Sequence, residues 1–136
     1  MTTGMEGLAA GASVLAGRAE GLRAAVDNGQ LVMDPEAAER VAKVYDEKAD
    51  DFRGFAREAQ QLITNSVFGE CFIGRDLEKK FNEKVQGSRD APDAGLIPVL
   101  RQAEKIFKDM AQAYRDSARD MQNADDENAR NLGRNA

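Results

Sequence analysis

The chain has 136 residues, enough for one domain with a modest hydrophobic core, and no apolar run approaches the ~20 residues that span a bilayer. Its formal net charge of −5 argues against a nucleic-acid partner, because phosphate contact needs a basic face. Histidine, the commonest general base and metal ligand, is absent and Cys71 is the one cysteine, so the sequence predicts no enzyme, no catalytic residues, no metal, no cofactor and no internal disulfide.

Residues 1–33 are rich in alanine and glycine and form the first of three predicted regions. Apolar side chains at helical spacing predict a weak amphipathic helix here: Leu8, Leu15, Leu22 and Val26. Its interior glycines each cost about 1 kcal/mol of helix stability relative to alanine. We therefore expect an N-terminal arm that orders only against a partner or the main body. Glu6 stands where a Sec signal peptide has basic residues, so we expect any export to use another route.

A long amphipathic helix is predicted from about residue 35 to residue 66. Asp34 is a good N-cap, and Pro35 suits the first helical position because an N–H there would be unpaired anyway. Apolar side chains then recur in steps of three and four: Val41, Val44, Tyr45, Ala49, Phe52, Phe55, Ala59, Leu62 and Ile63. At ~1.5 Å per residue this helix would be roughly 48 Å long, so it needs a long partner helix.

Residues 67–74 contain two glycines that bracket apolar residues, and they predict a turn. The turn motif consists of Phe68, Gly69, Phe72 and Gly74, and we expect both phenylalanines to pack into the end of a helical hairpin. Cys71 lies in the same turn. Its favoured interpretation is a small buried hydrophobe, since cysteine is among the most buried residue types; an intermolecular disulfide and a reactive thiol are the alternatives.

Two further helical segments follow the turn. The first begins at Asp76 and is interrupted near residues 87–95, where Gly87-Ser88 and Ala91-Pro92-Asp93 break the pattern. The second begins near Leu96, and its apolar stripe continues through Leu100, Ala103, Ile106, Phe107, Met110, Ala113, Tyr114, Ser117 and Met121. Residues 125–136 are polar, so we expect them to form a flexible tail.

This pattern predicts an all-α protein in which residues 34–124 form a long antiparallel helical hairpin. A hairpin buries only one of its two wide faces. We therefore expect the second apolar face to meet either the N-terminal arm or another molecule, in a homodimer or a heterodimer. The residues expected at such an interface are Phe52, Phe55, Leu62, Phe107, Met110 and Tyr114.

The turn and its flanking helices resemble the Trp-X-Gly (Esx-like) superfamily of type VII secretion substrates, and look closest to actinobacterial Esx-secretion-associated proteins. The resemblance covers about residues 32–130 and rests on Asp34-Pro35, on Phe68-Gly69-Glu70 with Gly74, and on Phe81. It implies a protein that is cytoplasmic before export and then secreted or co-secreted, and that dimerises through its helices. It also implies contact with the secretion machinery or with a larger secreted substrate.

Members of this superfamily end the second helix with a Tyr-x-x-x-Asp/Glu export signal, and the matching positions here are Met121 and Asp125. Methionine replaces the tyrosine, and Tyr114 completes no signal because Ala118 stands four residues after it. A frayed acidic helix end is the alternative interpretation of residues 121–125. The competing functions are a cytosolic adaptor or chaperone for a larger type VII secreted protein, and an enzyme, which would need a concave pocket with paired titratable groups.

Overall fold

The computed structural model describes residues 4–63 and 68–134, except for the side chains of residues 5, 120–122, 124, 125 and 134. Over these ranges the chain forms four α-helices and one 3-10 turn: α1 (Gly4–Asp27), α2 (Pro35–Gln60), α3 (Phe72–Gln86), η1 (Pro92–Ala94) and α4 (Leu96–Arg134). The predicted all-α class is confirmed, and the described ranges contain no strand.

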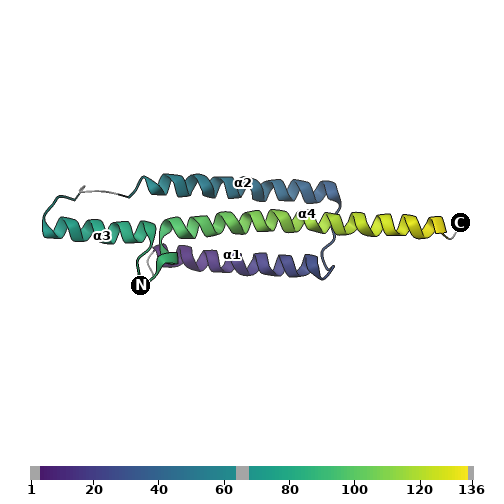
Figure 1. Cartoon of the computed structure of the whole chain (residues 1–136), viewed down its shortest axis with the longest axis horizontal. Coiled ribbons are helices and arrows are strands. Elements are labelled where there is room, and N and C mark those ends of the chain that lie inside the picture. The colour runs from purple at the N-terminus through teal and green to yellow at the C-terminus, as the bar shows by residue number, and fades with distance from the viewer. Residues whose placement is uncertain (1–3, 64–67, 135–136) are drawn as a thin grey trace.

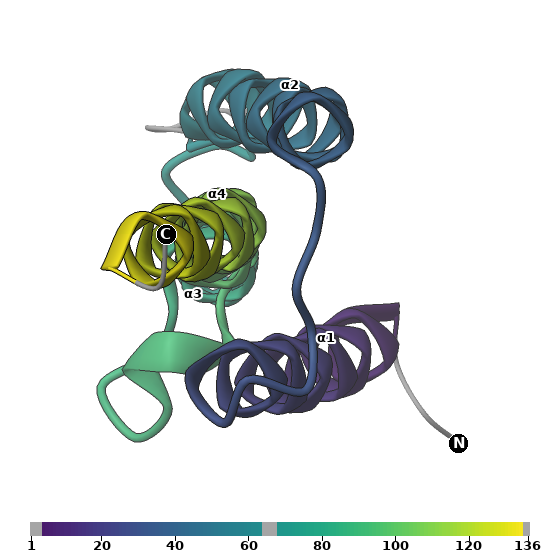
Figure 2. The ribbon, with the colours of Figure 1, turned by 90° about the vertical axis from the view of Figure 1, so that its right-hand side faces the viewer.

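Helix α4 is the centre of the molecule (Figures 1 and 2). It packs extensively against α2, which runs antiparallel to it, and against α1, which runs parallel to it. In the end-on view of Figure 2, α1 and α2 lie on different sides of α4, and they hardly touch each other. Helix α3 continues the line of α4 beyond the end of α2 (Figure 1).

Small side chains allow α2 and α4 to approach closely. All the fully buried residues of α2 are alanines: Ala38, Ala42, Ala49, Ala56 and Ala59. Together with Tyr45 and Phe52 they follow each other in steps of four and three, the spacing of helices that wind around each other with a left-handed twist. The facing row of α4 includes Leu100, which packs against Ala56 and Ala59.

Aromatic rings fill the space that the alanines leave between α2 and α4. The rings of Tyr114 and Tyr45 stack with their centroids 5.5 Å apart, and Tyr45 stacks on Phe107 at 6.1 Å. Phe107 in turn meets Phe52 at 5.2 Å. The rings therefore form a continuous ladder that holds the two helices in one register.

Helix α1 packs on a second row of α4 that begins one residue before the row facing α2. This row contains Val99, Ala103, Ile106, Met110, Ala113 and Ser117, all buried. Six side chains of α1 follow the same steps of four and three: Leu8, Ala12, Leu15, Ala19, Leu22 and Val26. The N-terminal region is thus a regular 24-residue helix that lies against the main body, because this packing outweighs the low helix propensity of its glycines.

Two predicted boundaries agree with the structure. Asp34 caps α2, since its Oδ2 accepts the backbone N–H groups of Glu36 at 3.2 Å and Ala37 at 3.3 Å. The interruption between α3 and α4 spans residues 87–95, as predicted. At this break Gly87 has a φ of +98°, and a Cβ there would overlap the carbonyl oxygen of Pro92.

Three other boundaries differ from the prediction. Helix α2 ends at Gln60, where i→i+3 hydrogen bonds tighten the chain, and residues 64–66 of the predicted helix lie outside the described residues. Helix α3 begins at Phe72 instead of Asp76, because the Sγ of Cys71 caps it by accepting the N–H of Gly74 at 3.4 Å. Helix α4 continues to Arg134, since nothing in the polar stretch expected as a tail breaks a helix before Gly133.

Candidate interaction surface

The predicted turn motif lies at the end of α3 that is farthest from α4 (Figure 1). Gly69 has a φ of +87°, which strongly favours glycine. Gly74 is buried, and a Cβ at this position would overlap the carbonyl oxygen of Phe68. The Phe68 ring meets the Phe81 ring edge to face, with centroids 6.1 Å apart. The contacts of Phe68 with Gly74 and Phe81 hold the turn against the first three turns of α3.

Two expectations about this tip were wrong. Phe72 does not pack into the end of the hairpin: it is 87% exposed, because α3 extends beyond the end of α2. Cys71 is exposed and caps a helix, so it is not a buried hydrophobe. Ile73 and Leu77 are also largely exposed, and the tip therefore presents an apolar surface to its surroundings.

The six residues expected at an interface fall into two groups. Phe52, Phe107 and Tyr114 belong to the ladder between α2 and α4, and Met110 is buried in the row of α4 that α1 covers. These four residues hold the chain together. Phe55 and Leu62, by contrast, are 48% and 46% exposed on α2. Three of the six residues are therefore used in the packing of α2 on α4, and one, Met110, is covered by α1.

The structure has an apolar hollow lined by α1, α2 and α4, beside Phe52 of the aromatic ladder; we call this hollow the inner groove. It is a cavity of about 220 Å³ lined by Gly7, Leu8, Gly11, Ala12, Leu15, Phe52, Val99 and Ala103. The cavity thus takes side chains from all three helices and is almost entirely apolar. Sequence reasoning missed it, although Gly7 and Gly11 are spaced one helical turn apart and so share a face of α1.

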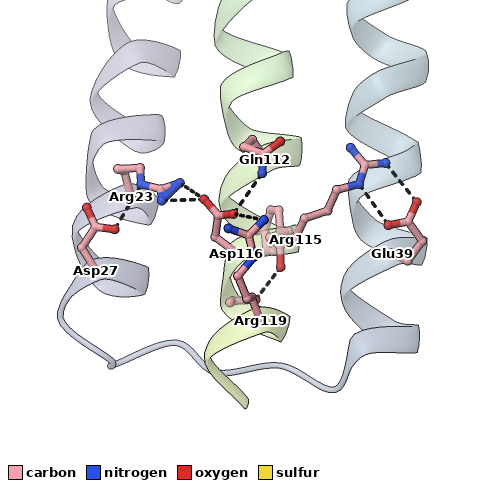
Figure 3. Close-up of polar contacts among 9 residues, drawn as sticks. Arg23, Asp27, Glu39, Gln112, Arg115, Asp116 and Arg119 are labelled. Carbon is pink, nitrogen blue, oxygen red and sulfur yellow. Dashed lines mark hydrogen bonds and ion pairs between the residues drawn. The ribbon is translucent and has the colours of Figure 1, made fainter. Parts of the chain in front are cut away.

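The outer face of the molecule is polar, and ion pairs connect α4 to both neighbouring helices (Figure 3). The Arg115 guanidinium donates to both carboxylate oxygens of Glu39 at 3.0 Å and to Asp46 at 2.8 Å. The hydrogen bonds from Arg115 to Glu39, with a smaller opposing effect of burial, hold the pKa of Glu39 below its usual range. The next residue, Asp116, points to the opposite side and accepts two hydrogen bonds from Arg23 of α1, at 2.7 and 2.8 Å.

Glu104 is a nearly buried carboxylate in the row of α4 that faces α2, and its side chain is only 11% exposed. Burial acts to raise its pKa, but hydrogen bonds from Lys108 and Arg53, both at 3.1 Å, outweigh burial and place the pKa below the usual value. Arg101 adds a contact at 3.4 Å. Glu104 is therefore ionised at neutral pH and links α2 to α4 through Arg53.

The export-signal candidates lie in the C-terminal half of α4. Met121 and Asp125 are one helical turn apart and so share a face of the helix, but their side chains lie outside the described residues. Among the residues described, no group of three or more His, Cys, Asp or Glu side chains could hold a metal ion.

No helix in the described part of the chain is long and apolar enough to cross a membrane. The surfaces available for chemistry or binding are the apolar tip, the apolar inner groove and the ion-paired outer face.

Comparison of the chain with protein-family models, with curated proteins and with solved structures finds no match.

Proposed function

We propose that this protein is an Esx-like helical hairpin, secreted or co-secreted through a type VII pathway, and that it acts by helix–helix binding and not by catalysis. The observation that carries the proposal is the long antiparallel packing of α2 on α4 across a seam of alanines. The Phe68-Gly69 turn would then be the end of the hairpin, with α3 and α4 together as its interrupted second arm.

The exposed apolar tip gives further support for a binding function. Phe72, Ile73 and Leu77 expose large side chains beside the turn in which Gly69 has a positive φ and Gly74 lies close to the backbone of Phe68. Apolar side chains that are exposed together on a protein surface often mark an interaction site. In the proposed function this tip contacts the secretion machinery or a larger secreted substrate.

An export experiment tests the proposal. The tagged full-length chain is expressed in an actinobacterial host with an active or an inactivated type VII ATPase, and the amounts in culture filtrate and cells are compared. We expect ATPase-dependent appearance in the filtrate. Met121→Tyr should raise that amount and Asp125→Ala should remove the signal.

Asp126→Ala is the matched control, because it deletes a neighbouring carboxylate on a different face of α4. It should leave export unchanged. Retention of the wild type and of Met121→Tyr in the cell, with the system active, would refute the export proposal. If the retained chain also kept a larger type VII substrate soluble, the adaptor or chaperone function would replace it.

A further inference from the structure

We propose that Asn28 is a site of spontaneous deamidation, and that its conversion to aspartate and isoaspartate loosens the end of α1 from α4. This reaction belongs to the chain itself and is independent of the proposed secretion function. The observations behind it are the Asn28-Gly29 dipeptide, its position at the end of α1, and the contacts that hold this end of the helix in place.

Asn28 is the one asparagine in the sequence that a glycine follows. Asparagine is among the chemically labile residues of proteins, and its deamidation begins when the backbone nitrogen of the next residue attacks the side-chain carbon Cγ. Glycine has no Cβ, so it leaves this approach unhindered and lets the backbone rotate into the conformation that the attack needs. The remaining asparagines all precede larger residues: Asn65, Asn82, Asn123, Asn128, Asn131 and Asn135.

The reaction needs water as its co-reactant and involves no oxidation or reduction. The Gly29 nitrogen loses its proton and bonds to Cγ of Asn28, while the bond from Cγ to the side-chain nitrogen breaks and ammonia leaves. The product is a cyclic succinimide. Water then opens this ring at one of its two carbonyl carbons. Attack at Cγ breaks its bond to the Gly29 nitrogen and gives aspartate, whereas attack at the backbone carbonyl of residue 28 gives isoaspartate.

The structure leaves this dipeptide accessible. Asn28 and Gly29 are exposed, and the Asn28 side chain forms no hydrogen bond with any residue that the structure describes. Helix α1 ends here in a Schellman motif, in which Gly29 has a φ of +72° and its N–H donates to the carbonyl oxygen of Val26 at 3.1 Å. The Gln30 N–H donates to that of Ala25 at 2.8 Å. The attacking nitrogen is thus held by a hydrogen bond at a helix end, where local opening costs little free energy.

Both products weaken this end of α1. Aspartate adds a negative charge beside Asp27 at the C-terminus of the helix, where the helix dipole is itself negative. Isoaspartate routes the chain through Cγ and so inserts a methylene into the backbone, which displaces the N–H groups of Gly29 and Gln30 from their acceptors. The same end of α1 carries Arg23, which donates to Asp116 at 2.7 and 2.8 Å and ties α1 to α4 (Figure 3). Deamidation therefore acts where α1 is attached.

Peptide mapping of the full chain tests whether Asn28 reacts. The folded protein is incubated at mildly alkaline pH and digested with trypsin, and the peptides are analysed by mass spectrometry with electron-transfer fragmentation, which distinguishes aspartate from isoaspartate. Residues 24–40 form one tryptic peptide, in which Asn28 is the one asparagine. Residues 120–130 form another, and its exposed Asn123 and Asn128 are the internal controls. Asn28 should convert at least about tenfold faster than either control, a difference of ~1.4 kcal/mol in activation free energy.

Variants test the roles of the side-chain amide and of the attachment of α1. Asn28→Gln keeps an amide but has to close a larger ring, so residue 28 should stay unconverted over the same time. Asp116→Ala removes the acceptor of Arg23 and should speed the conversion of Asn28 about threefold, because the end of α1 then opens more often. Asp51→Ala is the matched control, since it removes an exposed carboxylate of α2 that forms no ion pair with any described residue, and it should not change the rate.

Hydrogen exchange measures the consequence for α1. In Asn28→Asp, the amide hydrogens in the last turns of α1 should exchange about two- to fivefold faster than in the wild type. Exchange should be faster still in aged wild-type protein that contains isoaspartate, and unchanged in Asn28→Gln aged for the same time. Conversion of Asn28 in the folded chain at no more than the rate of Asn123 refutes the deamidation site. Unchanged exchange of α1 after conversion refutes the loosening.

Discussion

Replacing Phe107 by alanine tests whether the aromatic ladder holds α2 on α4. The Phe107 ring lies between those of Tyr45 and Phe52, with centroids 6.1 and 5.2 Å away, so truncation breaks the ladder in the middle. Removing a well-buried phenylalanine side chain costs about 3–5 kcal/mol, and each ring pair contributes about 0.5–1.5 kcal/mol beyond its area. Because Phe107 is only partly buried, we expect a loss of about 3 kcal/mol in the free energy of unfolding.

Urea denaturation followed by circular dichroism at the helical band measures this loss. With an m-value of about 2 kcal/mol/M, the midpoint should fall by about 1.5 M while the m-value stays constant. Phe55→Ala is the control, since Phe55 contacts one ring and is about half exposed, and it should cost about 1 kcal/mol. If Phe107→Ala costs no more than Phe55→Ala, the ladder does not stabilise the pairing of α2 with α4.

Four smaller changes use the same denaturation assay. Glu104→Gln should destabilise the chain by about 1–2 kcal/mol at pH 7, where the charge-assisted hydrogen bonds are intact. Folding lowers the pKa of Glu104, so the extra stability of the wild type over Glu104→Gln is complete above the unfolded pKa and disappears as the pH falls through the folded pKa. A stability difference that persists in acid would contradict this role. Gly69→Ala should cost about 1 kcal/mol because of the positive φ, whereas Gly54→Ala, in open space within α2, should stabilise by up to about 1 kcal/mol. Asp34→Ala should cost about 1 kcal/mol through loss of the α2 cap, and an unchanged midpoint would rule that cap out as a source of stability.

Helix boundaries with a local chemical cause were predictable from the sequence. Asp34 and Pro35 act through backbone groups within three residues, so no distant part of the chain can change their effect. The break at residues 87–95 is similar, because Gly87 readily adopts the positive φ found there, and Pro92 has a fixed φ and no backbone N–H.

The packing of α1 was harder to predict, because alanine carries no clear signal. Leu8, Leu15 and Leu22 recur every seven residues, but Ala12 and Ala19 complete the row that faces α4. Alanine fits a buried seam as well as a solvated face, so its position does not tell which side of a helix is covered. The inner groove could not be predicted either, because its position depends on which row of α4 packs against α1 and which row packs against α2.

The exposure of the tip follows from the lengths of two helices relative to each other. Phe72 would be covered if α2 reached as far as α3 does, but α2 ends at Gln60. The periodic pattern of α2 continues through Leu62 and Ile63, so the sequence predicts a longer helix than is present. Because Phe72 is the first residue of the 15-residue α3, which lies beyond the end of α2, the few helical residues predicted after Gln60 would not reach it (Figure 1).

The central position of α4 determines the order in which the helices are expected to unfold. Because α1 and α2 each pack on α4 and hardly on each other, α1 can detach while the α2–α4 pair keeps all of its contacts. Loss of α4 would leave both neighbours without a core. Amide hydrogens of α1 would then exchange through a local opening, and those in the middle of α4 only when the whole chain unfolds.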